Sequence, residues 1–194
     1  MRVEKNPWIP IADLLSSVVL VLLLLFVMAV IVPRFTQEAQ KREAIVQLQS
    51  ALHDYEVNGL VKLDMESGML EFTDITFDKG SALLNDKSIP AIKEVASVLV
   101  ANMDKNPQMQ ILIEGHTDPT VVTATVNKGG YFENNIQLSA LRASNVRGYL
   151  LQSMGEGYVN RIGIAGYGET RLKNNVDKMA SENRRVEVRM LWAE

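Results

Sequence analysis

The chain has 194 residues, no cysteine and a net charge of −3, from 20 basic and 23 acidic side chains. This near-neutral balance excludes the strongly basic composition that is typical of nucleic-acid-binding proteins. Without cysteine the chain has no disulfide, no thiol nucleophile and no thiol to carry a lipid. His53 and His116 are far apart and have no partner motif, so the sequence predicts neither a metal site nor a cofactor.

Residues 1–8 carry Arg2 and Lys5 and precede a long apolar run, so we expect a short cytoplasmic tail and then a transmembrane helix over residues 9–33. About 20 helical residues cross a hydrocarbon core of about 30 Å, and this run is long enough. Pro33 is expected to mark its end. The run is too long for a typical cleaved signal peptide. We predict a single-pass membrane protein; its placement in the bacterial inner membrane, with the C-terminal domain in the periplasm, is what the resemblance of that domain, given below, implies.

Asp13 is the one charged residue in this apolar run. A carboxylate at the bilayer centre costs about 2.5–3.5 kcal/mol, so intramembrane acids are usually functional. Trp8 resembles an interfacial aromatic, which places Asp13 inside the membrane, and Ser16 and Ser17 follow on the same helical face. We predict that Asp13 carries an ion and that the two serines support the ion path. The alternative is a helix N-cap at the headgroup level.

Residues 34–59 are polar and predict a helical linker, in which Gly59 ends the helix. Its apolar residues recur at the spacing of a narrow seam: Ile45, Leu48, Leu52 and Tyr55. Two interpretations remain open. The linker is a solvated helix that continues from the membrane, or its seam pairs with a second copy of the chain.

Residues 60–194 predict one α/β domain. Short strands are expected on either side of residues 67–68 and around Ile75 and Phe77. Longer elements follow in alternation: a helix near 89–100, a strand at 110–114, a helix capped by Ser139, a strand at 162–167 and a last strand at 186–191. This βαβαβ order with a closing strand predicts a two-layer α/β sandwich.

Four motifs lie at strand and helix ends of this domain. They are GHTD at 115–118, LSALRA at 138–143, GYGE at 166–169 and NRRVE at 183–187. With these motifs in this order, the chain resembles the OmpA-like peptidoglycan-binding domain from about Asp74 to Val188. The resemblance implies a site that binds the diaminopimelate of a peptide stem in the cell wall.

The resemblance also assigns residues to that site. Asp118 corresponds to the acid that accepts hydrogen bonds from the ligand's ammonium, and Arg142 corresponds to the arginine that pairs with its carboxylate. Thr117 and Asn135 match further binding positions. Arg185 is another candidate, with a structural role at the last strand as its alternative. No nucleophile–base pair or metal cluster accompanies these residues, so we expect a binding protein and not an enzyme.

The loop at 119–137 is longer than the family's usual connection. Gly129 and Gly130 suggest a flexible tip, and Tyr131 and Phe132 suggest an exposed aromatic pair. The loop either covers or tunes the binding cleft, or it is a passive insertion of the kind that surfaces tolerate.

The N-terminal part resembles MotB-type stator subunits, and especially ZorB subunits of Zorya anti-phage systems, through Trp8-Ile9, Ala12-Asp13 and the leucine-rich span. The resemblance implies a homodimer inside a ring of multispanning membrane subunits, in which Asp13 carries the ion that drives rotation. We favour a proton over sodium, because one carboxylate suffices for a proton. The sequence does not separate a flagellar motor from a phage-defence motor. The alternative is a passive membrane anchor that binds peptidoglycan.

Overall fold

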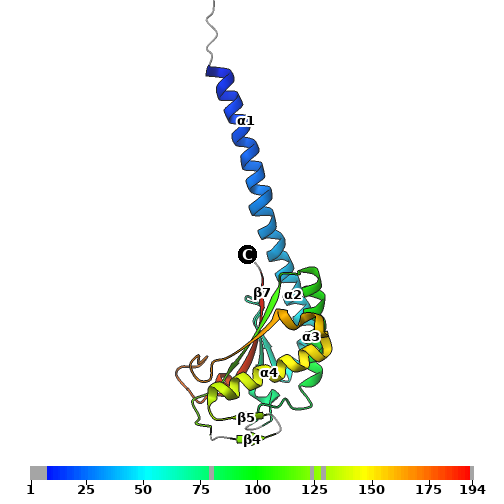
Figure 1. The fold of residues 1–194 in the computed structure, drawn as a ribbon, viewed down its shortest axis with the longest axis vertical. Helices are drawn as coiled ribbons and strands as arrows, with labels where there is room; N and C mark the ends of the chain where they lie inside the picture. Colours follow the sequence, from blue (N-terminus) through cyan, green and yellow to red (C-terminus); the bar gives the residue numbers. More distant parts are fainter. Residues whose placement is uncertain (1–7, 79–80, 123–124, 128–129, 193–194) are drawn as a thin grey trace, which may run out of the picture. The chain divides into compact units, whose positions relative to one another are not determined.

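The computed structural model describes residues 8–78, 81–122, 125–127 and 130–192 (Figure 1). The chain divides into two compact units, Met1–Lys41 and Arg42–Glu194. Each unit is described below by itself.

The first unit is helical and apolar. Helix α1, Trp8–Phe26, passes into a π-helical segment, η1, Val27–Ile31, and then into helix α2, Val32–Val57. The residues of α2 from Arg42 on belong to the second unit. No side chain of α1 is buried. Among the described residues, one helical stretch is long and apolar enough to cross a membrane, as the sequence predicts.

The prediction that the helix ends at Pro33 is wrong. Pro33 has no backbone N–H, and its ring crowds the carbonyl oxygen four residues earlier. In the structure the helix widens just before it, and the amide of Val32 donates to the carbonyl of Val27, five residues back. Such π-turns accommodate an interruption without ending a helix. Pro33 is therefore the second residue of α2, and the helix continues past it to Val57.

The second unit is built on a five-stranded sheet with the order β1-β2-β7-β3-β6. The strands are β1, Val61–Leu63; β2, Leu70–Thr73; β3, Gln110–His116; β6, Ile162–Gly166; and β7, Arg185–Leu191. Only β3 and β6 are parallel among these neighbours. A small antiparallel pair, β4, Thr125–Asn127, and β5, Gly130–Phe132, lies in the long loop.

Two helices cover the sheet. Helix α3, Ile89–Lys105, packs against helix α4, Asn135–Met154, and α4 lies across β3 and β6 (Figure 1). Their apolar faces meet the sheet in one core that includes Ile92, Leu99 and Val146. Three short 3₁₀ segments accompany these elements in the described part of the unit: η2, Asp74–Thr76; η3, Glu156–Arg161; and η4, Ser181–Asn183. The predicted two-layer α/β sandwich is confirmed.

The apolar seam of the linker packs inside its own chain. Ile45, Leu48 and Leu52 are at most 3% exposed, and Tyr55 packs against the same core. The Asn102 side-chain amide of α3 donates to Gln47 Oε1 of α2 at 3.0 Å, which holds the two helices together. The structure thus corrects the interpretation of these residues as a seam for a second copy, because their side chains are already buried.

Two helix and strand boundaries differ from expectation. Instead of the strand expected around Ile75 and Phe77, residues 74–76 form η2, and Phe77 makes a single bridge with Leu84. Helix α4 begins at Asn135, capped by Asn134, whose side chain accepts from the Gln137 amide at 2.9 Å. Ser139, the expected cap, is buried within the helix.

The long loop folds back onto the domain. Tyr131 is exposed, but Phe132 is only 2% exposed and packs with Ala82 and Leu138. The predicted exposed aromatic pair is therefore half wrong, because Phe132 anchors the hairpin. The predicted glycine tip includes Gly129, which lies outside the described residues.

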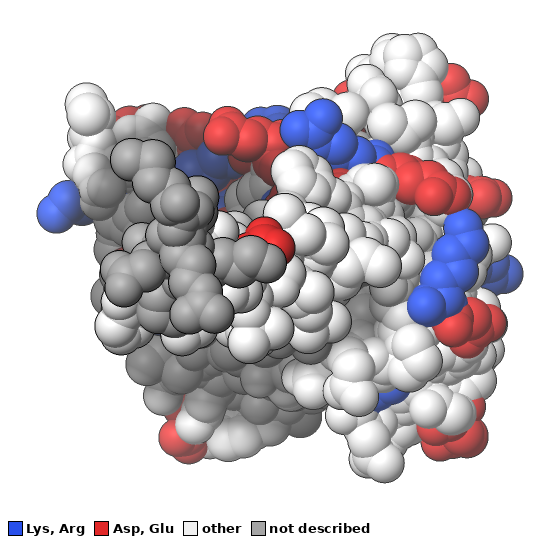
Figure 2. Space-filling model, turned by 90° about the horizontal axis from the view of Figure 1, so that it is seen from above, with Lys and Arg blue, Asp and Glu red and all other residues white. Residues whose placement is uncertain are grey.

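Charged side chains show no segregation on the face in Figure 2. Over its described residues, basic and acidic groups alternate along the rim. This distribution accords with the near-neutral composition of the chain.

Candidate functional site

A cavity of about 560 Å³ lies where β3, α4 and η2 meet. Thr117 and Asp118 follow directly after β3, and Asn135 and Arg142 come from α4. Four of the five predicted binding residues are thus brought together. The lining also contains side chains that were not predicted from the sequence, among them Asp74, Ile75, Phe77 and Arg184.

Close packing of glycines positions α4 beside the strands. A Cβ atom on Gly115 would lie 2.0 Å from the Ser139 carbonyl oxygen, and one on Gly166 would lie 2.7 Å from the Ala140 amide nitrogen. Such distances are well below van der Waals contact, so both positions need glycine. Ser139 Oγ also accepts from the Gly168 amide at 2.9 Å. The glycines of GHTD and GYGE therefore fix the helix that carries Arg142.

Asp118 is held in place from two sides. Its Oδ1 oxygen accepts from the Thr120 amide at 3.0 Å, and its Oδ2 oxygen lies 2.6 Å from Nη1 of Arg184. Burial alone would raise the pKa of Asp118, but the hydrogen bonds from Arg184 and Thr120 outweigh it and lower that pKa. Arg184 also contacts Asp74, with Nε 2.9 Å from Oδ2. The carboxylate is therefore ionised and oriented without a ligand.

Arg142 is buried, and one of its N–H donor groups has no hydrogen-bond partner among the described residues. Its Nε donates to the Ser81 carbonyl at 3.1 Å, and its guanidinium lies 4.9 Å from the centre of the Phe77 ring. The Nη1 atom is 3.9 Å from Asp74 Oδ1 and makes no hydrogen bond within the described part of the chain. A buried donor without a partner costs about 1–3 kcal/mol, or more when charged. The site is therefore prepared for an acceptor at Nη1.

Two further polar atoms of this cavity lack partners. Thr117 Oγ1 and Asn135 Oδ1 are buried and make no hydrogen bond to described residues. The Asn135 amide nitrogen is occupied, since it donates to the carbonyls of Asp118 at 3.3 Å and Thr120 at 3.0 Å. Unpaired donors and acceptors in one cavity, beside an ionised acid and a cation, favour a polar, zwitterionic ligand.

Comparison with known proteins agrees with this geometry. A family model described as the OmpA family matches residues 76–187, which is more than half of the chain. The chain belongs to the OmpA family. All four sequence motifs fall within the matched region. No curated protein sequence matches the chain.

Solved structures show the same fold. A MotB-like protein from Desulfovibrio vulgaris is 26% identical with a TM-score of 0.61, and the match covers 82% of this chain and 98% of that one. The cell wall anchor of the type VI secretion system from Pseudomonas aeruginosa is 25% identical with a TM-score of 0.59, covering 76% and 97%. The periplasmic domain of Helicobacter pylori MotB, at 22% identity, has a TM-score of 0.53 and covers 69% and 79%.

Arg185 does not line the cavity of this OmpA-family domain. It is buried, and its Nε donates to Glu187 Oε1 at 2.8 Å. Successive residues of a strand point to opposite faces, and Arg185 is the first residue of β7. Its neighbour Arg184, just before the strand, faces the cavity instead. The lining of the cavity therefore contains Arg184 and not the predicted Arg185.

Arg184 and Asp74 were missed from the sequence for different reasons. Arg184 stands in the NRRVE motif, but the motif alone does not tell which arginine faces the cavity. Asp74 precedes a segment that was predicted to be a strand, whereas η2 turns its carboxylate toward Arg184. Both residues could be recognised only from their closeness to Asp118 in the folded domain, and a single sequence does not contain that information.

The predicted ion-path residues lie in the other unit. Asp13 is an exposed residue of α1. Ser16 Oγ donates to the Ala12 carbonyl at 2.8 Å, and Ser17 Oγ donates to the Leu14 carbonyl at 2.7 Å. Both hydroxyls thus keep acceptor lone pairs for other groups.

Proposed function

We propose that this protein is the B-type subunit of an ion-driven rotary motor of the bacterial inner membrane. Asp13 carries the ion, with a proton favoured, and the OmpA-family domain anchors the complex to peptidoglycan in the periplasm. One observation carries the proposal: an acid lies within the membrane-length apolar helix of a chain whose other unit is an OmpA-family domain. Likeness to the MotB-like protein of Desulfovibrio vulgaris supports it.

The anchoring half follows from the cavity. A diaminopimelate centre has an ammonium and a carboxylate on one carbon. Asp118 accepts from the ammonium through lone pairs that Arg184 and Thr120 leave free, since each carboxylate oxygen has two. The ligand carboxylate meets Arg142 at Nη1, because Nε is occupied by the Ser81 carbonyl. Thr117 Oγ1 and Asn135 Oδ1 then supply the remaining uncharged contacts.

The motor half follows from the chemistry of an acid in hydrocarbon. Desolvation favours the neutral acid, so Asp13 binds a proton from one side and releases it where its surroundings become polar. One charge crossing 100 mV is worth about 2.3 kcal/mol, which is enough to shift an interface. The N-terminus is cytoplasmic in this scheme, and two copies work inside a ring of multispanning subunits. Flagellar-type and Zorya-type motors both fit.

A passive wall anchor is the second candidate. Likeness to the cell wall anchor of the type VI secretion system of Pseudomonas aeruginosa favours it. In this case no partner ring exists and Asp13 transports no ion. The N-cap role that was the alternative for Asp13 is wrong, because Asp13 lies within α1, Trp8–Phe26.

Ion flux separates the two candidates. Vesicles carrying the full chain and the membrane protein that co-purifies with it are compared for wild type, Asp13→Asn and Asp13→Glu. Asparagine keeps size and hydrogen bonding but carries no proton, whereas glutamate restores the carboxyl. Loss of flux in Asp13→Asn with recovery in Asp13→Glu supports the motor. Equal flux in all three, or no co-purifying partner, supports the passive anchor.

A further inference from the structure

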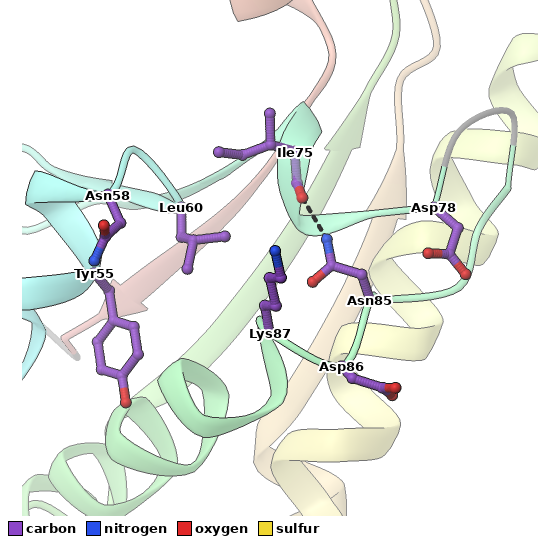
Figure 3. A pocket seen from close by; sticks show the side chains of 8 residues that line it. All are labelled: Tyr55, Asn58, Leu60, Ile75, Asp78, Asn85, Asp86 and Lys87. Atoms are coloured by element: carbon purple, nitrogen blue, oxygen red, sulfur yellow. Dashed lines mark hydrogen bonds between the residues drawn. The ribbon is translucent and has the colours of Figure 1, made fainter.

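Figure 3 shows a second cavity, of about 840 Å³, which shares the lining residue Ile75 with the first. Tyr55 at the end of α2 and Leu60 before β1 form one side, and Ile75 of η2 faces them. The segment 85–87, just before α3, closes another side. The cavity therefore gathers residues from four separate places in the second unit.

Ile75 connects the two cavities, because its side chain lines both. It is 56% exposed, and an exposed apolar group at a cavity is a natural contact for a ligand. Its backbone is fixed: the Asn85 side-chain amide donates to the Ile75 carbonyl (Figure 3). A ligand that fills the first cavity and continues beyond it therefore passes over the Ile75 side chain into the second.

The second cavity combines an apolar wall with a cation. Tyr55, Leu60 and Ile75 supply the wall, and Lys87 is the basic residue of the lining. In Figure 3 the Lys87 side chain extends toward Leu60 and Ile75. Its ammonium has no ion-pair partner among the described residues, although Asp86 is its neighbour in sequence. The Asp86 side chain points away from it in the same view.

This combination matches a small apolar group next to a carboxylate. An ammonium on a flexible stem binds a carboxylate as a point charge, and the wall covers methyl groups. The carboxylates of the lining, Asp78 and Asp86, lie on the opposite side from Tyr55, where they can accept amide N–H groups of a ligand (Figure 3). A peptide fits this lining, because it carries methyl, carboxylate and amide N–H groups together.

We propose that the second cavity binds the part of the peptide stem next to the diaminopimelate centre, and that Lys87 pairs with its free α-carboxylate. In a stem whose glutamate is linked through its side chain, that α-carboxylate remains free and an alanine methyl lies nearby. The proposal rests on the proposed peptidoglycan site. It adds that the protein distinguishes stems with a free α-carboxylate from stems in which this group is amidated.

The test measures binding of two synthetic tripeptides to the full chain in detergent. One is L-Ala–γ-D-Glu–diaminopimelate, and the other carries an amide in place of the glutamate α-carboxylate. Because exposed ion pairs stabilise weakly, wild type is expected to bind the free acid up to about fivefold more tightly. Lys87→Gln is expected to bind both tripeptides equally, at the level of the amidated one.

Two controls make the outcome specific. Lys93→Gln removes another exposed lysine, in α3, that does not line the cavity, and is expected to keep the wild-type preference. Asp118→Asn tests the first cavity and is expected to weaken both tripeptides together. Equal binding of both tripeptides by wild type, or an unchanged preference in Lys87→Gln, overturns the inference and leaves the proposed wall binding standing. Absence of any tripeptide binding, or full binding by Asp118→Asn, overturns the proposed site itself.

Discussion

Nη1 of Arg184 lies 2.6 Å from Oδ2 of Asp118, and the same guanidinium reaches Asp74 through Nε at 2.9 Å. One partly exposed arginine therefore holds two carboxylates at the cavity. The Asp118 carboxylate thus already has a cationic partner before any ligand binds. It is oriented and kept ionised by a neighbour that is itself part of the site.

Arg184 and Arg185 are expected to differ when each is changed to glutamine. Arg184→Gln removes the ion pair that orients the Asp118 carboxylate and keeps it ionised, so stem-peptide binding is expected to weaken. The loss of stability is small, because a partly exposed ion pair contributes only about 1 kcal/mol or less. Arg185→Gln leaves the buried Glu187 without its closest partner, which costs about 3–5 kcal/mol. Thermal unfolding and tripeptide binding, measured on both variants, check this split. Equal effects on both quantities in both variants contradict it.

Gly115 is expected to tolerate no side chain. Its Cβ would lie 2.0 Å from the Ser139 carbonyl oxygen, so Gly115→Ala forces α4 away from β3 and is expected to cost at least about 1–3 kcal/mol of stability. Gly148→Ala is the matched control, because Gly148 lies within α4 itself and an added Cβ would meet nothing within 4 Å. This control is expected to gain about 0.5–1 kcal/mol from helix propensity. Denaturant unfolding of both variants is the measurement.

His116 makes stability depend on pH. Burial, with help from the Arg185 guanidinium, lowers its pKa from 6.5 to about 4 in the folded domain. As the pH falls from 6.5 toward 4, the unfolded chain gains a proton that the folded chain does not. The pKa of Glu187 acts in the same direction at the acidic end: burial would raise it, but the hydrogen bond from Arg185 lowers it. Stability is therefore expected to fall with the pH.

The size of this effect is on the order of 1–3 kcal/mol, and it is measured as the midpoint of thermal unfolding across that pH range. His116→Asn is expected to flatten the profile. His53→Asn, which changes the exposed histidine of α2, is expected to leave it steep. A profile that stays steep in His116→Asn assigns the effect to other groups.

The fold and most of the site could be predicted because they depend on local patterns. A short apolar run indicated β3, and alternating apolar residues indicated β7. The motif order indicated the cavity around Asp118 and Arg142. Three predictions from the sequence differ from the structure, and each difference has a physical reason. The seam of α2 has the same spacing whether its partner is another chain or its own core. The π-helical segment before Pro33 lets the helix continue past the proline. Which of Arg184 and Arg185 lines the cavity depends on the direction in which each side chain points at the start of β7.

Leu48 is expected to behave as a core residue. It is 1% exposed within the domain, so Leu48→Ala leaves a cavity and costs about 2–5 kcal/mol. Val46, on the same helix and 58% exposed, is the control, and Val46→Ala is expected to change stability by about 0.5 kcal/mol or less. Because the packing is intramolecular, the unfolding midpoint of the Leu48 variant should shift equally at every protein concentration. A shift that grows on dilution would instead place Leu48 between two copies, since dissociation then contributes to unfolding.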